Sequence, residues 1–298
     1  MYRRSFLFHQ YPGRCFTAGK PFAVEVPRPG KYKVTITLKT ETPLESVSIC
    51  TGSGNLSFTG SIPAGVFKHI AVVNVGDTVP EGHSRISHDR IITTTVTAEA
   101  DCLSRLSVSE ISCPTIYIAG TSSEIPTQML SAYTGQRLAV SDHSHAGLTT
   151  ESFRKEGHYA AINEYSRPGD FYFFQFAPTG QTIEEWAPGG NCRRQLARYI
   201  IECRERLAYP VLLTPAFHCS GMKPDDASHQ LWKQCLEAYR EVSALTETPV
   251  IELHKLSVNS CDAYAAAGSV AQEIAQTCEK HPEKRYRFLA KCMQTKCS

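Results

Sequence analysis

The stretch Pro114-Thr-Ile-Tyr-Ile-Ala-Gly-Thr-Ser-Ser-Glu124 joins an apolar run of β type to a turn of small residues. β-branched and aromatic side chains favour a strand over residues 115–119, and Gly120 with the hydroxyl residues after it ends that strand. The turn would present Ser122 at the tip of the strand. A serine in that position is a candidate nucleophile, so we expect the protein to be built around it.

Downstream of this stretch, short apolar runs alternate with helical stripes. Runs that suit buried parallel strands cover residues 115–119, 137–140, 170–176, 210–214 and 249–253. Helices are expected between them, over residues 151–165, 192–207 and 227–245. This alternation predicts an α/β layered domain with a parallel sheet over residues 113–298. Ligands of such sheets bind outside the carboxyl ends of the strands, where Ser122, Gly147 and Thr179 would lie.

The first 112 residues carry a β pattern instead. Between Lys31 and Lys39, apolar residues at every second position alternate with Lys or Thr, as in a strand with one buried face. Further β-branched runs follow at residues 66–75 and 91–98, and no helical stripe intervenes. We therefore expect an antiparallel β-sandwich over residues 1–112.

Composition excludes several classes of partner. The 298 residues have a formal net charge of +2, 20% of them are charged, and no block of five Lys or Arg occurs. Nucleic acid and an acidic membrane surface are therefore poor partners, and a small polar ligand is expected. The N-terminal apolar patch is too short for a signal peptide and no run approaches about 18 apolar residues, which predicts a soluble, cytoplasmic chain. The pattern neither supports nor excludes oligomerisation.

Twelve cysteines are scattered from Cys15 to Cys297. They form no CxxC pairs and are not combined with a histidine pair in a zinc-finger pattern, so the sequence predicts neither a zinc site nor a thioredoxin motif. We expect reduced thiols that serve mainly as small core residues, and no metal.

A nucleophilic serine needs a base, normally a histidine that a third group orients. Of eleven histidines, His281 stands out because it directly precedes Pro282 in a segment that suits the first turn of a helix. A histidine placed there, after the last strand, can reach back over the ends of the sheet. His281 is therefore the candidate base.

Four blocks of this sequence resemble those of SGNH (GDSL-type) hydrolases, and in particular of rhamnogalacturonan acetylesterases. Pro114-Thr-Ile-Tyr-Ile-Ala-Gly-Thr-Ser122 is similar to the family's P-T-I-Y-L-A-G-D-S run, and residues 145–157 resemble its second block with an S-F…E-G signature. Residues 168–176 are similar to the P-G-D-Y…Q-F strand, and His281 to the D-x-x-H block. The blocks follow the family's order over residues 114–298.

The resemblance implies a flavodoxin-like, three-layer SGNH domain behind a galactose-binding-like β-sandwich. It implies a serine esterase that removes acetyl groups from an acetylated oligosaccharide or another small ester, without cofactor or metal. Ser122 would be the nucleophile and His281 the base. The oxyanion would be held by the N–H groups of Ser122 and Gly147 and by the hydroxyl of Thr179.

The sequence also departs from the family at functional positions. Thr121 replaces the acidic residue beside the nucleophile, Thr179 replaces the oxyanion asparagine, and Cys278 replaces the aspartate of the triad. Glu279 and Asp262 are the remaining acids that could orient His281. Two interpretations stay open: a weakened carbohydrate esterase, or an inactive pseudo-esterase that acts as a carbohydrate-binding or scaffold protein.

Three aromatic side chains near the expected cleft are candidates for substrate binding. His143 and His145 flank the expected cleft, and Trp186 lies in an insertion after the third block. For Trp186, packing inside the domain is the alternative to stacking against a sugar.

Overall fold

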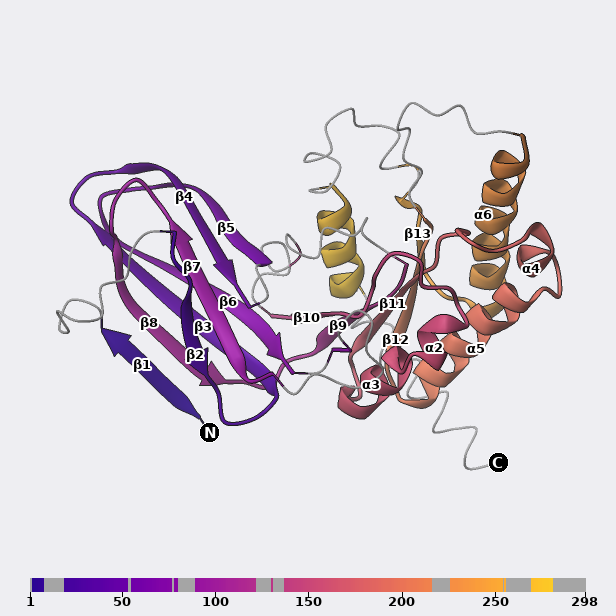
Figure 1. The fold of residues 1–298 in the computed structure, drawn as a ribbon, viewed down its shortest axis with the longest axis horizontal. Coiled ribbons are helices and arrows are strands. Elements are labelled where there is room, and N and C mark those ends of the chain that lie inside the picture. Colours follow the sequence, from indigo (N-terminus) through magenta and orange to yellow (C-terminus); the bar gives the residue numbers. More distant parts are fainter. Residues whose placement is uncertain are drawn as a thin grey trace.

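The computed structural model describes residues 2–7, 19–52, 55–76, 78–79, 89–121, 130, 137–215, 226–253, 255 and 269–280. Within these residues the chain forms two antiparallel sheets and one parallel sheet (Figure 1). The antiparallel strands end at Glu110 and the parallel strands begin at Thr115. The division of the chain into domains at residues 112–113 stays a prediction.

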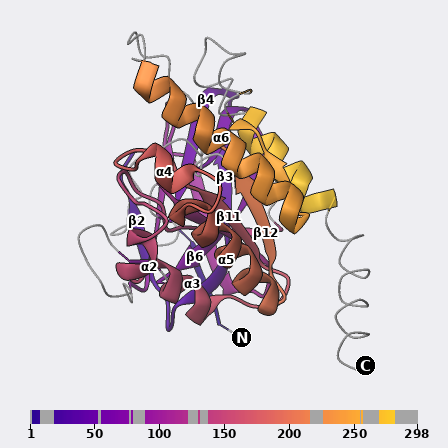
Figure 2. The same cartoon turned by 90° about the vertical axis from the view of Figure 1, so that its right-hand side faces the viewer.

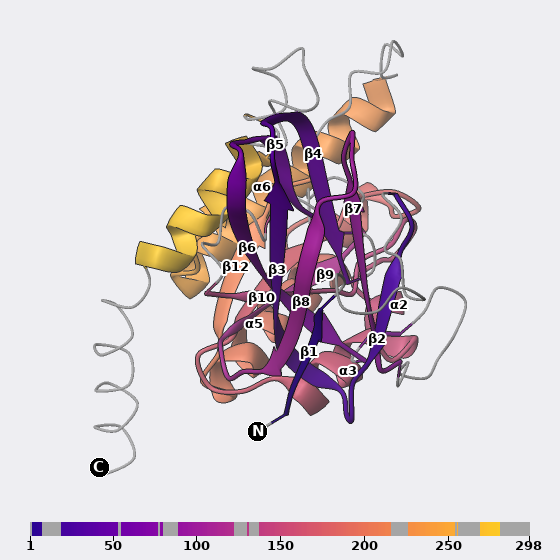
Figure 3. The ribbon, with the colours of Figure 1, turned by 90° about the vertical axis from the view of Figure 1, so that its left-hand side faces the viewer.

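The two antiparallel sheets pack face to face as a β-sandwich (Figure 3). One has the order β1-β8-β3-β6, with bounds Arg3–Leu7, Leu103–Glu110, Gly30–Thr40 and Gly65–Val75. The other has the order β2-β7-β4-β5, with bounds Phe22–Glu25, Ile91–Thr97, Leu44–Thr51 and Asn55–Ile62. Val34 and Ile36 of β3 share one buried core with Ile49 of β4 and Val96 of β7. The alternating pattern of β3 therefore predicted its buried face correctly.

The third sheet is parallel and has the order β10-β9-β11-β12-β13. Its strands are β9 (Thr115–Gly120), β10 (Ala139–Asp142), β11 (Phe171–Gln175), β12 (Tyr209–Leu213) and β13 (Val250–Ile251). Numbered along this part of the chain the order is 2-1-3-4-5, which is that of flavodoxin-like folds. The predicted fold class is confirmed, since every expected strand of the second half is present.

Helices cover both faces of the parallel sheet. They are α2 (Ser152–Lys155), α3 (His158–Tyr165), α4 (Ile183–Trp186), α5 (Asn191–Glu205), α6 (Asp226–Thr246) and the helical residues 269–280. The helix expected over 151–165 is divided in two, because Gly157 has a left-handed φ of +90°. The sequence did not predict α4 or the helical residues 269–280.

Alternate side chains of β9 enter two different cores. Tyr117 and Ala119 pack with residues of α2, α3, α5 and α6, which lie in front of the sheet in Figure 2. Ile116 and Ile118 pack on the other face, with Ile274 of the helical residues 269–280. A strand buried on both faces reads as a continuous apolar run, which is why the sequence signalled it so clearly.

An ion pair between the partly buried Lys31 and the buried Asp170 links the sandwich to the parallel sheet. Lys31 of β3 lies 3.6 Å from the carboxylate of Asp170, and its ammonium also donates to the carbonyl of Cys113 at 2.9 Å. Asp170 accepts backbone N–H bonds from Thr115 and Arg167, each 2.7 Å long. This carboxylate therefore fixes the starts of β9 and β11 relative to β3.

Among the described residues, no helix is long and apolar enough to cross a membrane.

The ends of β9 and β11 approach each other so closely that only glycine fits at position 120. Gly120 has a φ of +138°, and a Cβ atom there would overlap the backbone carbonyl of Gln175. Gly180 also has a positive φ, of +73°, but a Cβ atom there would meet nothing within 4 Å. A comparison of alanine substitutions at these two positions therefore separates the cost of backbone strain from the cost of steric overlap.

We expect Gly120→Ala to lower the free energy of unfolding by at least about 3 kcal/mol, because strain and overlap add. Gly180→Ala should cost only the strain, about 1–2 kcal/mol. Urea denaturation of both variants checks this. Equal losses would show that the contact between β9 and β11 is not tight.

Candidate functional site

The candidate site lies outside the carboxyl ends of β9, β10 and β11. β9 is flanked by β10 on one side and β11 on the other, and the chain changes direction across the sheet at this point. Such a topological switch point is where open α/β sheets bind ligands. The described backbone around it comprises the end of β9, the turn after β10 and the turn after β11.

Thr121 joins these three segments. Its backbone N–H donates to the carbonyl of Gln175 at 2.7 Å. Its hydroxyl donates to the carbonyl of Leu148 at 2.6 Å and accepts the N–H of Ala177 at 2.9 Å. Thr121 stands where the family's sequence block has an acidic residue. Its hydroxyl is a hydrogen-bonded junction between the loop after β10 and the loop after β11.

Gly147 and Thr179 lie on those two loops. Gly147 is exposed, has a φ of +85° and directly precedes Leu148, whereas Thr179 is exposed and lies two residues beyond Ala177. Thr121 therefore brings together the loops that carry both predicted oxyanion residues. A further hydrogen bond links the loop after β10 to the end of β9: the backbone N–H of His145 donates to the carbonyl of Gly120 at 3.3 Å.

The predicted nucleophile and base, Ser122 and His281, lie outside the described residues, as does Asp262. Glu279 is described and exposed near the end of the helical residues 269–280. Its neighbour Cys278 is buried in the core beneath the sheet, and burial, with the nearby Glu279 carboxylate, raises the pKa of this thiol to about 12. Cys278 is thus a neutral packing residue where the resemblance places a triad carboxylate.

Two predicted substrate-binding residues need correction. Trp186 is fully buried, donates its indole N–H to the side chain of Gln181 at 3.1 Å and stacks on Tyr239. It therefore packs inside the domain and offers no platform to a sugar. His143 is 1% exposed and pairs with the Ser141 hydroxyl at 3.0 Å. Burial, reinforced by two neighbouring histidines, lowers the pKa of His143 to about 3, so it is a neutral core residue.

The third candidate, His145, is partly exposed and has a partner that the sequence did not reveal. Its Nε2 atom lies 3.0 Å from Nε2 of His158, and that atom lies 3.6 Å from a carboxylate oxygen of Glu156. Gly157, between Glu156 and His158, has the left-handed conformation that turns both side chains toward His145. The glycine after Glu156 was the available signal, but the pairing depends on a turn that spacing alone does not fix.

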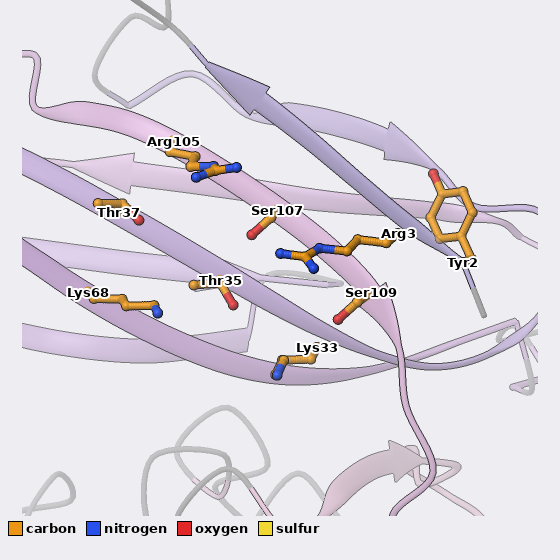
Figure 4. Close-up of a pocket in the computed structure, with 9 residues that line it drawn as sticks. All are labelled: Tyr2, Arg3, Lys33, Thr35, Thr37, Lys68, Arg105, Ser107 and Ser109. Carbon is orange, nitrogen blue, oxygen red and sulfur yellow. The ribbon is translucent and has the colours of Figure 1, made fainter.

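A separate cavity of about 480 Å³ lies on the sandwich, over the outer face of the sheet β1-β8-β3-β6 (Figure 4). Four cationic side chains line it: Arg3, Lys33, Lys68 and Arg105. Among the residues that the structure describes, none of these four forms an ion pair. Hydroxyl groups of Thr and Ser side chains fill the space between them. The cavity is thus positively charged and rich in hydrogen-bonding groups.

Thr121→Val removes the hydroxyl junction while keeping the side-chain volume. Because the carbonyl of Leu148 and the N–H of Ala177 then lose their partner, we expect the free energy of unfolding to fall by about 1–3 kcal/mol. Thr179→Val, on an exposed loop, should change it by less than about 0.5 kcal/mol. Thermal or urea denaturation of both variants measures the difference, and equal stability would contradict the junction.

Comparisons with known proteins give a partial sequence match. No protein-family model matches the chain. Rhamnogalacturonan acetylesterase RhgT of Bacillus subtilis (strain 168) is 27% identical over 114 residues, which are 38% of this chain and 49% of that protein. The chain therefore spans about half the length of the curated relative that it matches.

Among solved structures, protein YXIM of Bacillus subtilis matches with 18% identity and a TM-score of 0.44, over 89% of this chain and 80% of the other. A lipase/acylhydrolase from Enterococcus faecalis has 18% identity and a TM-score of 0.42, covering 55% and 96%. An acetyl-xylooligosaccharide esterase from Geobacillus has 11% identity and a TM-score of 0.38, covering 55% and 93%. Because these TM-scores are low, the likeness to SGNH hydrolases rests on the strand order of the parallel sheet and on the four sequence blocks. On that basis the chain resembles SGNH-type carbohydrate esterases, as its motifs predicted.

Proposed function

We propose that the protein hydrolyses an O-acetyl ester on a carbohydrate, with Ser122 as nucleophile. The observation that supports this most strongly is the junction at Thr121. It gathers the loops after β10 and β11 around the end of β9, directly before Ser122. The resemblance to rhamnogalacturonan acetylesterases supplies the substrate class, an acetylated oligosaccharide.

In the proposed reaction, Ser122 Oγ attacks the acetyl carbonyl carbon while His281 takes the hydroxyl proton. The tetrahedral intermediate then collapses, the C–O bond to the sugar breaks, and His281 returns the proton to the leaving sugar hydroxyl. Water, deprotonated by His281, then attacks the acetyl-serine; the bond between the acetyl carbon and Ser122 Oγ breaks, His281 returns the proton to Oγ, and acetate leaves. No metal or organic cofactor takes part in these steps.

The negative oxygen of each intermediate needs hydrogen-bond donors. We assign this role to the N–H groups of Ser122 and Gly147 and to the Thr179 hydroxyl, and the exposure of Gly147 and Thr179 leaves both able to meet a substrate. A missing oxyanion donor lowers kcat about 10²- to 10³-fold, and a missing carboxylate behind the histidine about 10⁴-fold. With Cys278 neutral, Glu279 or Asp262 must orient His281, so a weakened esterase is expected.

We further propose a cytoplasmic location. The seven cysteines that the structure describes are all free, and five of them are buried. Burial raises the pKa of Cys203 and Cys235 well above the usual thiol value, which keeps both thiols protonated and unreactive. Reduced, buried thiols are typical of the cytosol.

Initial rates with p-nitrophenyl acetate, and acetate release from acetylated pectic and xylan oligosaccharides, test the proposed activity. Ser122→Ala should lower kcat at least about 1,000-fold, since the nucleophile is lost. Ser228→Ala, on the exposed surface of α6, is the matched control and should keep the wild-type rate. Turnover that is the same in wild type and Ser122→Ala would overturn the proposal.

The positive cavity on the sandwich favours a second candidate function, the binding of an acidic carbohydrate without catalysis. In the strand register, Arg3 and Lys33 both lie opposite Ser109, and Arg105 and Lys68 both lie opposite Thr37. The two cationic rows are four residues apart, about 13 Å along the strands. Such rows suit a chain of sugars with repeated carboxylates, since guanidinium groups bind carboxylates through paired hydrogen bonds.

Calorimetric titration with oligogalacturonate tests this binding function. The wild type should bind, with affinity that falls as salt rises, and Arg3→Ala/Arg105→Ala should weaken binding at least about tenfold. Lys233→Ala, with an exposed lysine on α6, should bind as the wild type does, and Ser122→Ala should leave affinity unchanged. Equal affinity of the double variant and the Lys233→Ala control would contradict a site on this face.

A further inference from the structure

His145, Glu156 and His158 direct one ligand atom each toward a common point beside the candidate site. The three atoms lie within 4.8 Å of one another. The Nε2 atoms of the two imidazoles are 3.0 Å apart, and the Glu156 oxygen is 3.6 Å from Nε2 of His158. With zinc–nitrogen bonds of 2.0–2.1 Å, two ligands of a tetrahedral zinc ion are separated by roughly 3.3 Å. The separations of 3.0 Å and 3.6 Å lie on either side of that value.

The surroundings hold His158 in place. Its ring is fully buried and stacks on Phe153, with ring centroids 5.4 Å apart and planes 16° from parallel. Among the described residues its Nδ1 atom has no hydrogen-bond partner, so Nε2 makes the only polar contacts of this buried ring. His145 and Glu156 are more exposed, which leaves a route for an ion to reach the cluster.

The chemistry of the three side chains also suits a cation. Glu156 supplies a negative charge. Two imidazoles and one carboxylate form a ligand set that suits zinc and related divalent transition metals, and a fourth position would remain for water.

We propose that His145, Glu156 and His158 form a binding site for a divalent transition metal ion, with zinc as the best-fitting ion. The sequence did not reveal the site, because the two histidines are thirteen positions apart and the turn at Gly157 brings them together. The site lies beside the end of β9, since the backbone of His145 bonds to Gly120. It is independent of whether Ser122 acts as a nucleophile.

Isothermal titration of the chelator-treated, reduced protein with zinc chloride tests the site. The wild type should bind one equivalent that is lost, or weakened at least about tenfold, in Glu156→Gln and in His145→Ala. Both residues are at least partly exposed, so neither substitution threatens folding as His158→Ala does. The matched controls are Glu164→Gln and His229→Ala, which alter exposed residues on α3 and α6 and should bind as the wild type does.

The absorption spectrum of bound cobalt(II) distinguishes this site from a site formed by cysteine thiolates. Cobalt bound by His145, Glu156 and His158 should give visible d–d absorption without the near-ultraviolet charge-transfer band of a cobalt–thiolate bond, and Glu156→Gln should abolish it. The proposal is overturned if the wild type binds no zinc, if all variants bind equally, or if the cobalt spectrum is that of thiolate ligands.

Discussion

The close contact between the ends of β9 and β11 is the constraint on which the candidate site depends. Gly120 allows the backbone of β9 to approach Gln175, and Thr121 then bonds to Gln175, Leu148 and Ala177. The Thr121 hydroxyl bonds to Leu148 in the loop after β10 and to Ala177 in the loop after β11, so it couples the loops that carry Gly147 and Thr179. A hydroxyl in this position can donate to one loop and accept from the other, whereas an ionised carboxylate only accepts. The threonine thus holds the loops together without the acidic side chain that the resemblance leads one to expect.

Much of this fold could be predicted because its signals are local. The two-residue alternation of β3 and the continuous apolar run of β9 follow from burial on one face and on two faces. The junction at Thr121 was missed because its partners, Leu148 and Ala177, are 27 and 56 residues away in the chain. Trp186 was ambiguous for the same reason, since the ring on which it stacks, Tyr239, belongs to α6.

Two candidate functional features lie at the same edge of the parallel sheet. One is the strand end before Ser122, and the other is the cluster of His145, Glu156 and His158. They share the loop after β10, because His145 bonds to Gly120 through its backbone and to His158 through its ring. Sequence spacing gave no indication of the cluster, since it depends on the left-handed turn at Gly157. The cationic face of the sandwich is a third, separate feature that suits an acidic glycan.

The central claim is that Ser122 is an activated nucleophile, and covalent labelling with a fluorophosphonate tests it most directly. Fluorophosphonates modify a serine only where a base and an oxyanion site activate it. The account predicts one adduct per chain, located by fragmentation mass spectrometry on Ser122 within the tryptic peptide 106–137 and lost in His281→Ala. Absence of an adduct from the folded wild-type protein, or labelling that persists in His281→Ala, would contradict the account.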